Sequence, residues 1–202
     1  MLADQSIDTY LQRLAGKSST PGGGAAAGIA GAQAAALLGM VAQYSKDESL
    51  SLPTIIAMCE TSSRHFLALA DQDIAGFNQV MAAYGLPAND SAAKQRKQVA
   101  LQQALETAAL APTEMLKACL ALLSTAITLR DRGNKNLITD VGIAASLLLS
   151  CIQSSRLNLL VNLKAITNQT FRDDSLSLLA ATATPIADFN QLINSIEAGL
   201  AP

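Results

Sequence analysis

Three consecutive glycines open the most unusual stretch of this chain. They follow Thr20-Pro21 and lead into an uncharged run of small and aliphatic residues from Ala25 to Ala42. Glycine lets a second backbone or a ligand approach closely. We expect a helix that Ser19 or Thr20 caps and whose first turn contains Pro21, with free amides that can bind an anion. The alternative is an alanine-rich helix packed tightly on a neighbour. The three glycines are Gly22, Gly23 and Gly24.

The composition favours closely packed helices. We expect the 202 residues to form one domain, 1–202, with a full core. Half of the residues are hydrophobic but only 3% are aromatic, so the core consists mainly of alanine, leucine and isoleucine. No strand pattern or internal repeat is visible. We therefore expect an all-α antiparallel bundle of about six to eight helices.

Charge and residue counts argue against several partners. The net charge is −2 and no basic face is evident, so we expect no nucleic-acid binding. The three cysteines lie in apolar helical runs, which is typical of buried reduced thiols in a cytoplasmic protein. His65 is the only histidine. We therefore expect no metal site. The cysteines are Cys59, Cys119 and Cys151.

The run from Pro21 to Ala42 has the length of a membrane span. Its alanines and glycines contribute little transfer free energy, and Gln33 lies in the middle. We expect a buried helix and no membrane partner.

Apolar spacing and capping residues predict the other helices. A short one is expected around Ile7 to Leu14, and the alanine-rich one ends near Tyr44. Asn89-Asp90-Ser91 and then Thr139 or Asp140 are the predicted caps of two later helices. The later helices are expected over about Pro53–Tyr84, Ser91–Arg130 with a kink or restart at Pro112, Thr139–Ile166, Phe171–Thr182 and Pro185–Ala198.

Acidic side chains on apolar helices are candidate site residues. Asp73 shares a helical face with Ala70 and Phe77, where a carboxylate is costly unless it is paired or kept for chemistry. Asp71 points about 160° away from it. Asp140 opens another apolar helix, where a plain N-cap is the alternative role.

Asn158 and Asn162 share one face of that same apolar helix. Two amides in such a helix need hydrogen-bond partners. The partners are either a neighbouring helix or a ligand.

Five motifs in order resemble those of the cyclodeaminase/cyclohydrolase family, which comprises the C-terminal domain of formiminotransferase-cyclodeaminase and free-standing bacterial relatives. Together they cover nearly the whole chain. The family's serine after the glycines is Ala25 here, and its alanine before Phe77 is Gly76. Tyr44-Ser45-Lys46-Asp47-Glu48 replaces a T-x-G followed by basic residues. The motifs are Pro21-Gly22-Gly23-Gly24, Asp71-Gln72-Asp73-Ile74-Ala75-Gly76-Phe77, Leu86-Pro87, Gly133-Asn134 with Asp140, and Asn158 through Asn162-Leu163.

The resemblance implies an all-helical homodimer with sites near its interface and a tetrahydrofolate substrate. We expect no cofactor. Members of the family hydrolyse 5,10-methenyltetrahydrofolate to 10-formyltetrahydrofolate, or cyclise 5-formiminotetrahydrofolate with loss of ammonia. Two alternatives are a folate-binding relative without catalysis and a structural helical dimer without a ligand.

The methenyl substrate is a delocalised cation, which suggests roles for the acidic residues. We expect Asp140 to act as base or acid, and Asp73 to stabilise the cation or orient water. Lys46 is expected to meet the glutamate tail. The other predicted substrate-binding residues are Pro21 with the amides of Gly22, Gly23 and Gly24, Asn158 and Asn162 for the pterin ring, and Asp71 and Asn134.

Overall fold

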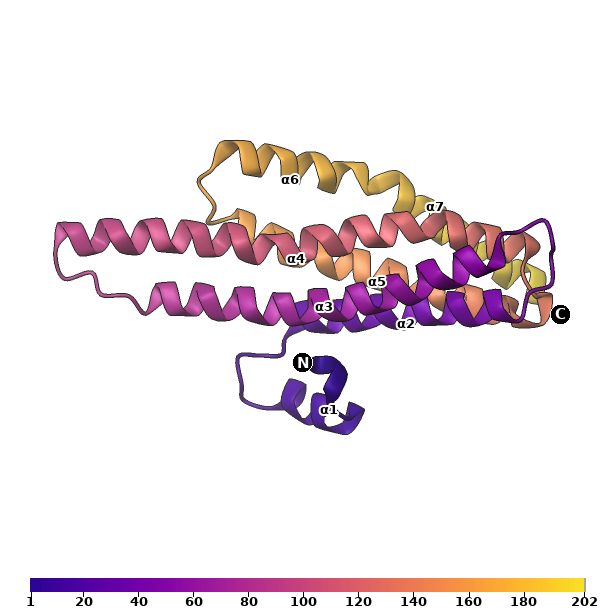
Figure 1. Ribbon diagram of the computed structural model, residues 1–202. Helices are drawn as coiled ribbons and strands as arrows, with labels where there is room; N and C mark the ends of the chain where they lie inside the picture. The colour runs from indigo at the N-terminus through magenta and orange to yellow at the C-terminus, as the bar shows by residue number, and fades with distance from the viewer. Residues whose placement is uncertain (202) are drawn as a thin grey trace.

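The computed structural model describes residues 1–201, and these contain seven α-helices and two short 3₁₀ helices (Figure 1). No strand occurs in this part of the chain, so the predicted all-α bundle is confirmed. The elements are η1 (Leu2–Asp4), α1 (Ile7–Ala15), α2 (Gly23–Gln43), α3 (Leu52–Tyr84), α4 (Ser91–Arg132), η2 (Lys135–Leu137), α5 (Ile138–Leu163), α6 (Gln169–Ala181) and α7 (Ala183–Leu200).

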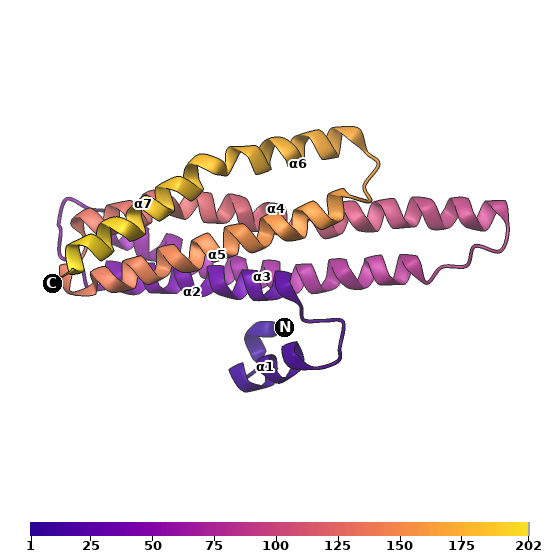
Figure 2. The ribbon, with the colours of Figure 1, turned by 180° about the vertical axis from the view of Figure 1, so that it is seen from behind.

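Helices α2 to α5 form the body of the bundle, and each runs antiparallel to the next (Figure 1). Beyond the start of α2 and the end of α5, the hairpin of α3 and α4 continues without the other helices. Helix α7 packs on α5 and α4, and α6 lies beside the end of α5 with few contacts (Figure 2). Helix α1 lies against the other side of the bundle, near the start of α2.

The small residues of α2 allow α3 to pack directly on its backbone. A Cβ atom on Gly31 would lie 2.5 Å from Cδ1 of Phe66, and one on Gly28 would lie 2.8 Å from Cβ of Ala70. Real Cβ atoms do not approach this closely, so both glycines are required for the α2–α3 contact. Phe66 and Ala70 are fully buried there.

The predicted cap of α2 is wrong. The helix begins at Gly23 with Gly22 as N-cap, and no side chain of the adjoining segment caps it. Pro21 precedes the helix, because the three glycines themselves form the cap and first turn. The amides at the start of α2 are therefore left for a partner from elsewhere in the chain.

The start of α5 also differs from the prediction, because neither Thr139 nor Asp140 is its cap. Residues Lys135–Leu137 form the 3₁₀ helix η2, and Asn134 caps it by accepting a hydrogen bond from the amide of Asn136. Helix α5 then begins at Ile138, which places Asp140 in its first turn.

Helix α4 continues through Pro112 without the predicted restart. Proline has no N–H to donate to the carbonyl four residues earlier, so the carbonyl of Ala108 lacks its helical partner.

The second half of α3 is less buried than the apolar pattern predicts. Phe77, Met81 and Tyr84 are 38%, 50% and 50% exposed. The reason is the hairpin: this part of α3 packs on α4 beyond the start of α2 (Figure 1).

Three helical segments are long and apolar enough to cross a membrane by length and composition alone. One of them is α2, whose most apolar window is 61% buried inside the bundle. The three cysteines are buried thiols, as predicted, and burial raises the pKa of Cys59 to about 11.

Candidate functional site

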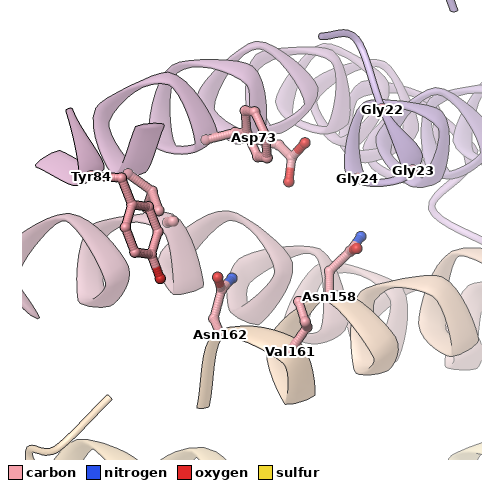
Figure 3. Close-up of a pocket in the computed structure, with 11 residues that line it drawn as sticks. Gly22, Gly23, Gly24, Asp73, Tyr84, Asn158, Val161 and Asn162 are labelled. Carbon is pink, nitrogen blue, oxygen red and sulfur yellow. The ribbon is translucent and has the colours of Figure 1, made fainter. Parts of the chain in front are cut away.

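A cavity of about 380 Å³ lies where the start of α2 meets the C-terminal part of α3, the middle of α4 and the end of α5 (Figure 3). Six of the residues predicted from sequence line it, and they are the polar or backbone part of its wall. These are Gly22, Gly23, Gly24, Asp73, Asn158 and Asn162. The rest of the wall is Phe77, Val80, Tyr84, Ala108 and Val161.

The carboxylate of Asp73 lies directly against the backbone of Gly24. A Cβ atom on Gly24 would lie 2.0 Å from Oδ1 of Asp73, whereas nothing lies within 4 Å of a Cβ atom on Gly22 or Gly23. The amide of Ala25 donates a hydrogen bond to this carboxylate. Asp73 of α3 thus supplies the missing cap of α2, and the third glycine makes the space for it.

Burial raises the pKa of Asp73, and the hydrogen bond from the Ala25 amide offsets only part of this effect. Among residues 1–201, no cationic nitrogen lies within 4 Å of the carboxylate. A partly desolvated carboxylate without a counter-ion favours a cationic ligand or a proton. This is the usual electrostatic condition of a catalytic acid or base.

The side chains of Asn158 and Asn162 point into the cavity from one face of α5 (Figure 3). Neither amide forms a hydrogen bond to another side chain or backbone group in the described part of the chain. The alternative of interhelical hydrogen bonding is therefore not realised. Both amides are available to a ligand that presents donors and acceptors.

The apolar wall contributed by α3 was not among the residues predicted from the sequence. Tyr84 lies at the end of the cavity nearest Asn162 (Figure 3). Phe77, Val80 and Tyr84 follow Asp73 by four, seven and eleven residues, which is the spacing of one helical face. This spacing was a signal that could have identified them. They form the apolar flank of a site whose polar centre is Asp73.

Ala108 reaches the cavity because α3 and α4 approach closely. A Cβ atom on Gly76 would lie 2.9 Å from Cα of Ala108. Glycine in place of the family's alanine thus permits this contact.

Two other predicted residues lie close in sequence but outside the cavity lining. Pro21 is buried and directly precedes the three glycines. Asp71 faces the N-terminal segment, where its Oδ1 accepts a hydrogen bond of 2.9 Å from the amide of Leu2. The 160° separation predicted between Asp71 and Asp73 accounts for their different surroundings.

Lys46, Asn134 and Asp140 lie together at what we call the distal end of the bundle, formed by residues 44–51 and 132–140. The side-chain amide of Asn134 donates to the carbonyl of Tyr44 at 3.0 Å, and Lys46 is exposed. This end joins α2 to α3 and α4 to α5 (Figure 1).

The distal end is far from the cavity within one chain. Asp140 precedes Asn158 by eighteen residues of α5, or about 27 Å at 1.5 Å per residue. Asp73 and Asp140, which were both expected to act on the substrate, therefore do not lie in one site within a single chain. The role of Asp140 stays a prediction.

Comparisons with known proteins agree on one family. Residues 6–180 match the family model of formiminotransferase-cyclodeaminase. The methenyltetrahydrofolate cyclohydrolase of Methylorubrum extorquens is 32% identical over 200 residues, which are 96% of this chain and 96% of that protein. The formimidoyltransferase-cyclodeaminase of Rattus norvegicus is 28% identical over 178 residues, which are 85% of this chain but only 33% of that protein.

A solved structure has the same fold over nearly the full length. The crystal structure of formiminotetrahydrofolate cyclodeaminase from Thermotoga maritima superposes with a TM-score of 0.88 at 29% sequence identity. The match covers 99% of both chains.

Proposed function

Because the chain belongs to the formiminotransferase-cyclodeaminase family, we propose that it hydrolyses 5,10-methenyltetrahydrofolate to 10-formyltetrahydrofolate. The family identified from the motifs is thus confirmed. The nearly full-length similarity to a methenyltetrahydrofolate cyclohydrolase supports this activity. The Thermotoga relative supports cyclisation of 5-formiminotetrahydrofolate with release of ammonia as the second candidate.

The observation that carries the proposal is the partly buried, unpaired carboxylate of Asp73 at the start of α2. The methenyl substrate carries a positive charge delocalised over N5, the bridging carbon and N10. A carboxylate beside such a cation stabilises it in the low-dielectric wall of a cavity. The same contact favours the ionised form of Asp73, which is the form that can act as a base.

One carboxylate is sufficient for the proton transfers of hydrolysis. A water molecule attacks the bridging carbon while Asp73 takes one of its protons. The resulting carbinol loses its hydroxyl proton to solvent as the carbonyl forms and the bond from carbon to N5 breaks. Asp73 returns its proton to N5, so the products are 10-formyltetrahydrofolate and one released proton.

The remaining wall suits the pterin ring. The amides of Asn158 and Asn162 offer donors and acceptors to its edge, and the first amides of α2 can donate to its carbonyl oxygen. Phe77 and Tyr84 flank the ring with aromatic surface. Roles for Pro21, Lys46, Asp71 and Asn134 in substrate binding stay predictions.

We also propose a homodimer in the cytoplasm, without a membrane or nucleic-acid partner. Lys135–Leu163 has the hydropathy of a membrane span, yet only 33% of its most apolar window is buried within the chain. Its exposed residues include Ile143, which is 52% exposed. A second copy packed on the first half of α5, around Ile143, would bury it and leave the end of α5 uncovered. The buried, unpaired thiols support a reducing compartment.

The proposal is tested by assaying both folate substrates side by side. We expect the absorbance of 5,10-methenyltetrahydrofolate to decay with the protein faster than without it, and little ammonia from 5-formiminotetrahydrofolate. The opposite pattern would establish the second candidate. Binding without turnover, seen as a raised Tm with folates, would indicate a non-catalytic folate-binding protein, and no effect of any folate would contradict the proposal.

A further inference from the structure

A second hollow, of about 520 Å³, opens next to the cavity between the end of α5 and α6. Val161 is part of the wall of both, so the two spaces adjoin across a single side chain. Figure 2 shows α6 beside the end of α5, joined to it by a short connection. We call this second hollow the α5–α6 trough.

The trough has apolar walls and two cations at one end. Leu157 and Leu160 of α5 and Leu176 of α6 are 69%, 40% and 46% exposed, which is unusual for large aliphatic side chains gathered in one place. Val161, Leu163, Lys164 and Arg172 complete the lining.

We propose that the α5–α6 trough binds the aminobenzoyl-glutamate portion of the folate substrate, with Lys164 as the main contact for its carboxylates. This inference rests on the proposed function. In the methenyl substrate the aminobenzoyl ring is bonded to N10, which belongs to the reacting ring itself. The aromatic ring must therefore leave the cavity beside the reaction centre, and Val161 marks an exit into an apolar space.

The charges of the trough match those of the tail. Lys164 is exposed and has no carboxylate within 4 Å among residues 1–201. One nitrogen of Arg172 donates to the carbonyls of Leu163 and Ile166, which fixes the guanidinium at the end of α5. Each glutamate adds a carboxylate, and a fixed guanidinium beside a free ammonium suits several of them.

The nearby acidic residues of α6 do not line the trough. Asp173 and Asp174 follow Arg172 on α6 and are exposed, and Asp173 accepts a hydrogen bond from Gln169. By helical geometry, Leu176 shares the face of Arg172, whereas Asp174 points about 160° away from Leu176.

Other cations are less suitable. Lys46, predicted for this role from the sequence, lies beyond the far end of α2, about 30 Å along that helix from the glycines. Lys97 donates to the carbonyl of Tyr84 at 2.6 Å and so caps the end of α3. The structure thus favours Lys164 over both within one chain.

The test compares 5,10-methenyltetrahydrofolate monoglutamate with its pentaglutamate. We expect the wild-type protein to have a lower KM for the pentaglutamate, and Lys164→Gln to raise that KM about tenfold with kcat nearly unchanged, because the lost contact is equal in the ground and transition states. The KM for the monoglutamate should change less. Lys117→Gln, at an exposed lysine that pairs with Glu114, is the matched control.

A second variant tests the apolar wall. Leu176→Asn lies on α6 and should raise KM for both substrates, while sedimentation shows an unchanged oligomeric state. A change of oligomeric state with no change in KM would mean that the trough binds a second copy of the chain instead. A rise in KM for Lys46→Gln but not for Lys164→Gln would also overturn the proposal.

A direct binding measurement tests the trough independently of catalysis. Calorimetry with p-aminobenzoyl-pentaglutamate should show binding that Lys164→Gln weakens and that added salt screens. If wild-type protein turns over neither folate but binds this probe, the proposed activity fails and the trough survives. If it is active but binds the probe equally with and without Lys164, the trough proposal fails alone.

Discussion

The cavity and the distal end each contain an aspartate that accepts a backbone amide hydrogen bond, but their surroundings differ. Asp47 at the distal end also accepts hydrogen bonds from the hydroxyl of Ser49 and from Nε of Arg132, the latter at 3.0 Å. These contacts lower its pKa to about 2. Asp73 accepts from the amide of Ala25 and has no cationic partner among residues 1–201, and burial raises its pKa.

The difference separates a structural carboxylate from a reactive one. At the distal end the polar groups are hydrogen-bonded to one another: Arg132 donates to Asp47, and Asn134 donates to Ser45 and to the carbonyl of Tyr44. These bonds join the two connections at this end of the bundle. At the cavity, Asp73 has no cationic partner among residues 1–201, and the side-chain amides of Asn158 and Asn162 have no hydrogen-bond partner there; all three face a hollow. A polar group that the fold positions but does not satisfy is the better candidate for binding and chemistry.

The largest effect on activity is expected from removing the negative charge of Asp73. Asp73→Asn should lower kcat/KM for 5,10-methenyltetrahydrofolate by about 10³-fold, because the base and the charge complementary to the cation are lost together. Steady-state assays by absorbance measure this directly, with circular dichroism to confirm the fold. Activity within a few-fold of wild type would place the chemistry elsewhere.

A smaller loss is expected from moving the same carboxylate without removing it. Gly24→Ala places a Cβ atom on the carboxylate of Asp73 and should cost about 10²-fold in kcat/KM. Gly23→Ala is the matched control, since nothing lies within 4 Å of its added Cβ atom. Equal effects of the two substitutions on kcat/KM would contradict a functional contact between Asp73 and Gly24.

Replacing Asp73 and replacing Asp47 by asparagine should change Tm in opposite directions. Because the folded-state pKa of Asp73 is raised, its charge destabilises the fold above that pKa, and this cost disappears as pH falls towards the ordinary range of aspartate. Asp73→Asn should therefore raise Tm at pH 7, where the side-chain oxygen of Asn can still accept from Ala25. The gain should shrink on acidification.

For Asp47 the sign is reversed. Its pKa is lowered from 3.8 to about 2, so its stabilisation is present above the ordinary value and is lost as pH falls through about 2. Asp47→Asn should lower Tm slightly at pH 7, and the two curves should converge near pH 2. Shifts of the same sign in both variants would contradict the contrast between the regions.

The smallest effect on activity is expected at Asp140. Because Asp140 lies about 27 Å from Asn158 along α5, Asp140→Asn should leave kcat near the wild-type value. This departs from the sequence-based expectation, in which Asp140 is the base or acid. A loss of several orders of magnitude would show that a second copy brings its distal end to the cavity, and mixing Asp73→Asn with Asp140→Asn protein would then restore activity.

Helical periodicity was sufficient to predict the bundle, its long helices and the inward position of Asp73. Capping was predicted less well, because the partner of the α2 amides is Asp73, some fifty residues later in the chain, and no local pattern reports such a contact. The same limit applies to the site. The motifs included Asp140 as well as Asn158, and Lys46 was expected to meet the glutamate tail although its segment departs from the family's pattern. Only the packing of four long helices separates the cavity from the distal end.

The most direct measurement is a crystal structure with bound 5-formyltetrahydrofolate, a stable analogue of the substrate. We predict the pterin in the cavity, with the formyl-bearing nitrogen within about 4 Å of the Asp73 carboxylate and the Asn158 and Asn162 amides on the ring edge. A ligand bound beside Lys46 and Asp140 in the same chain, with the cavity at Gly24 empty, would contradict the account.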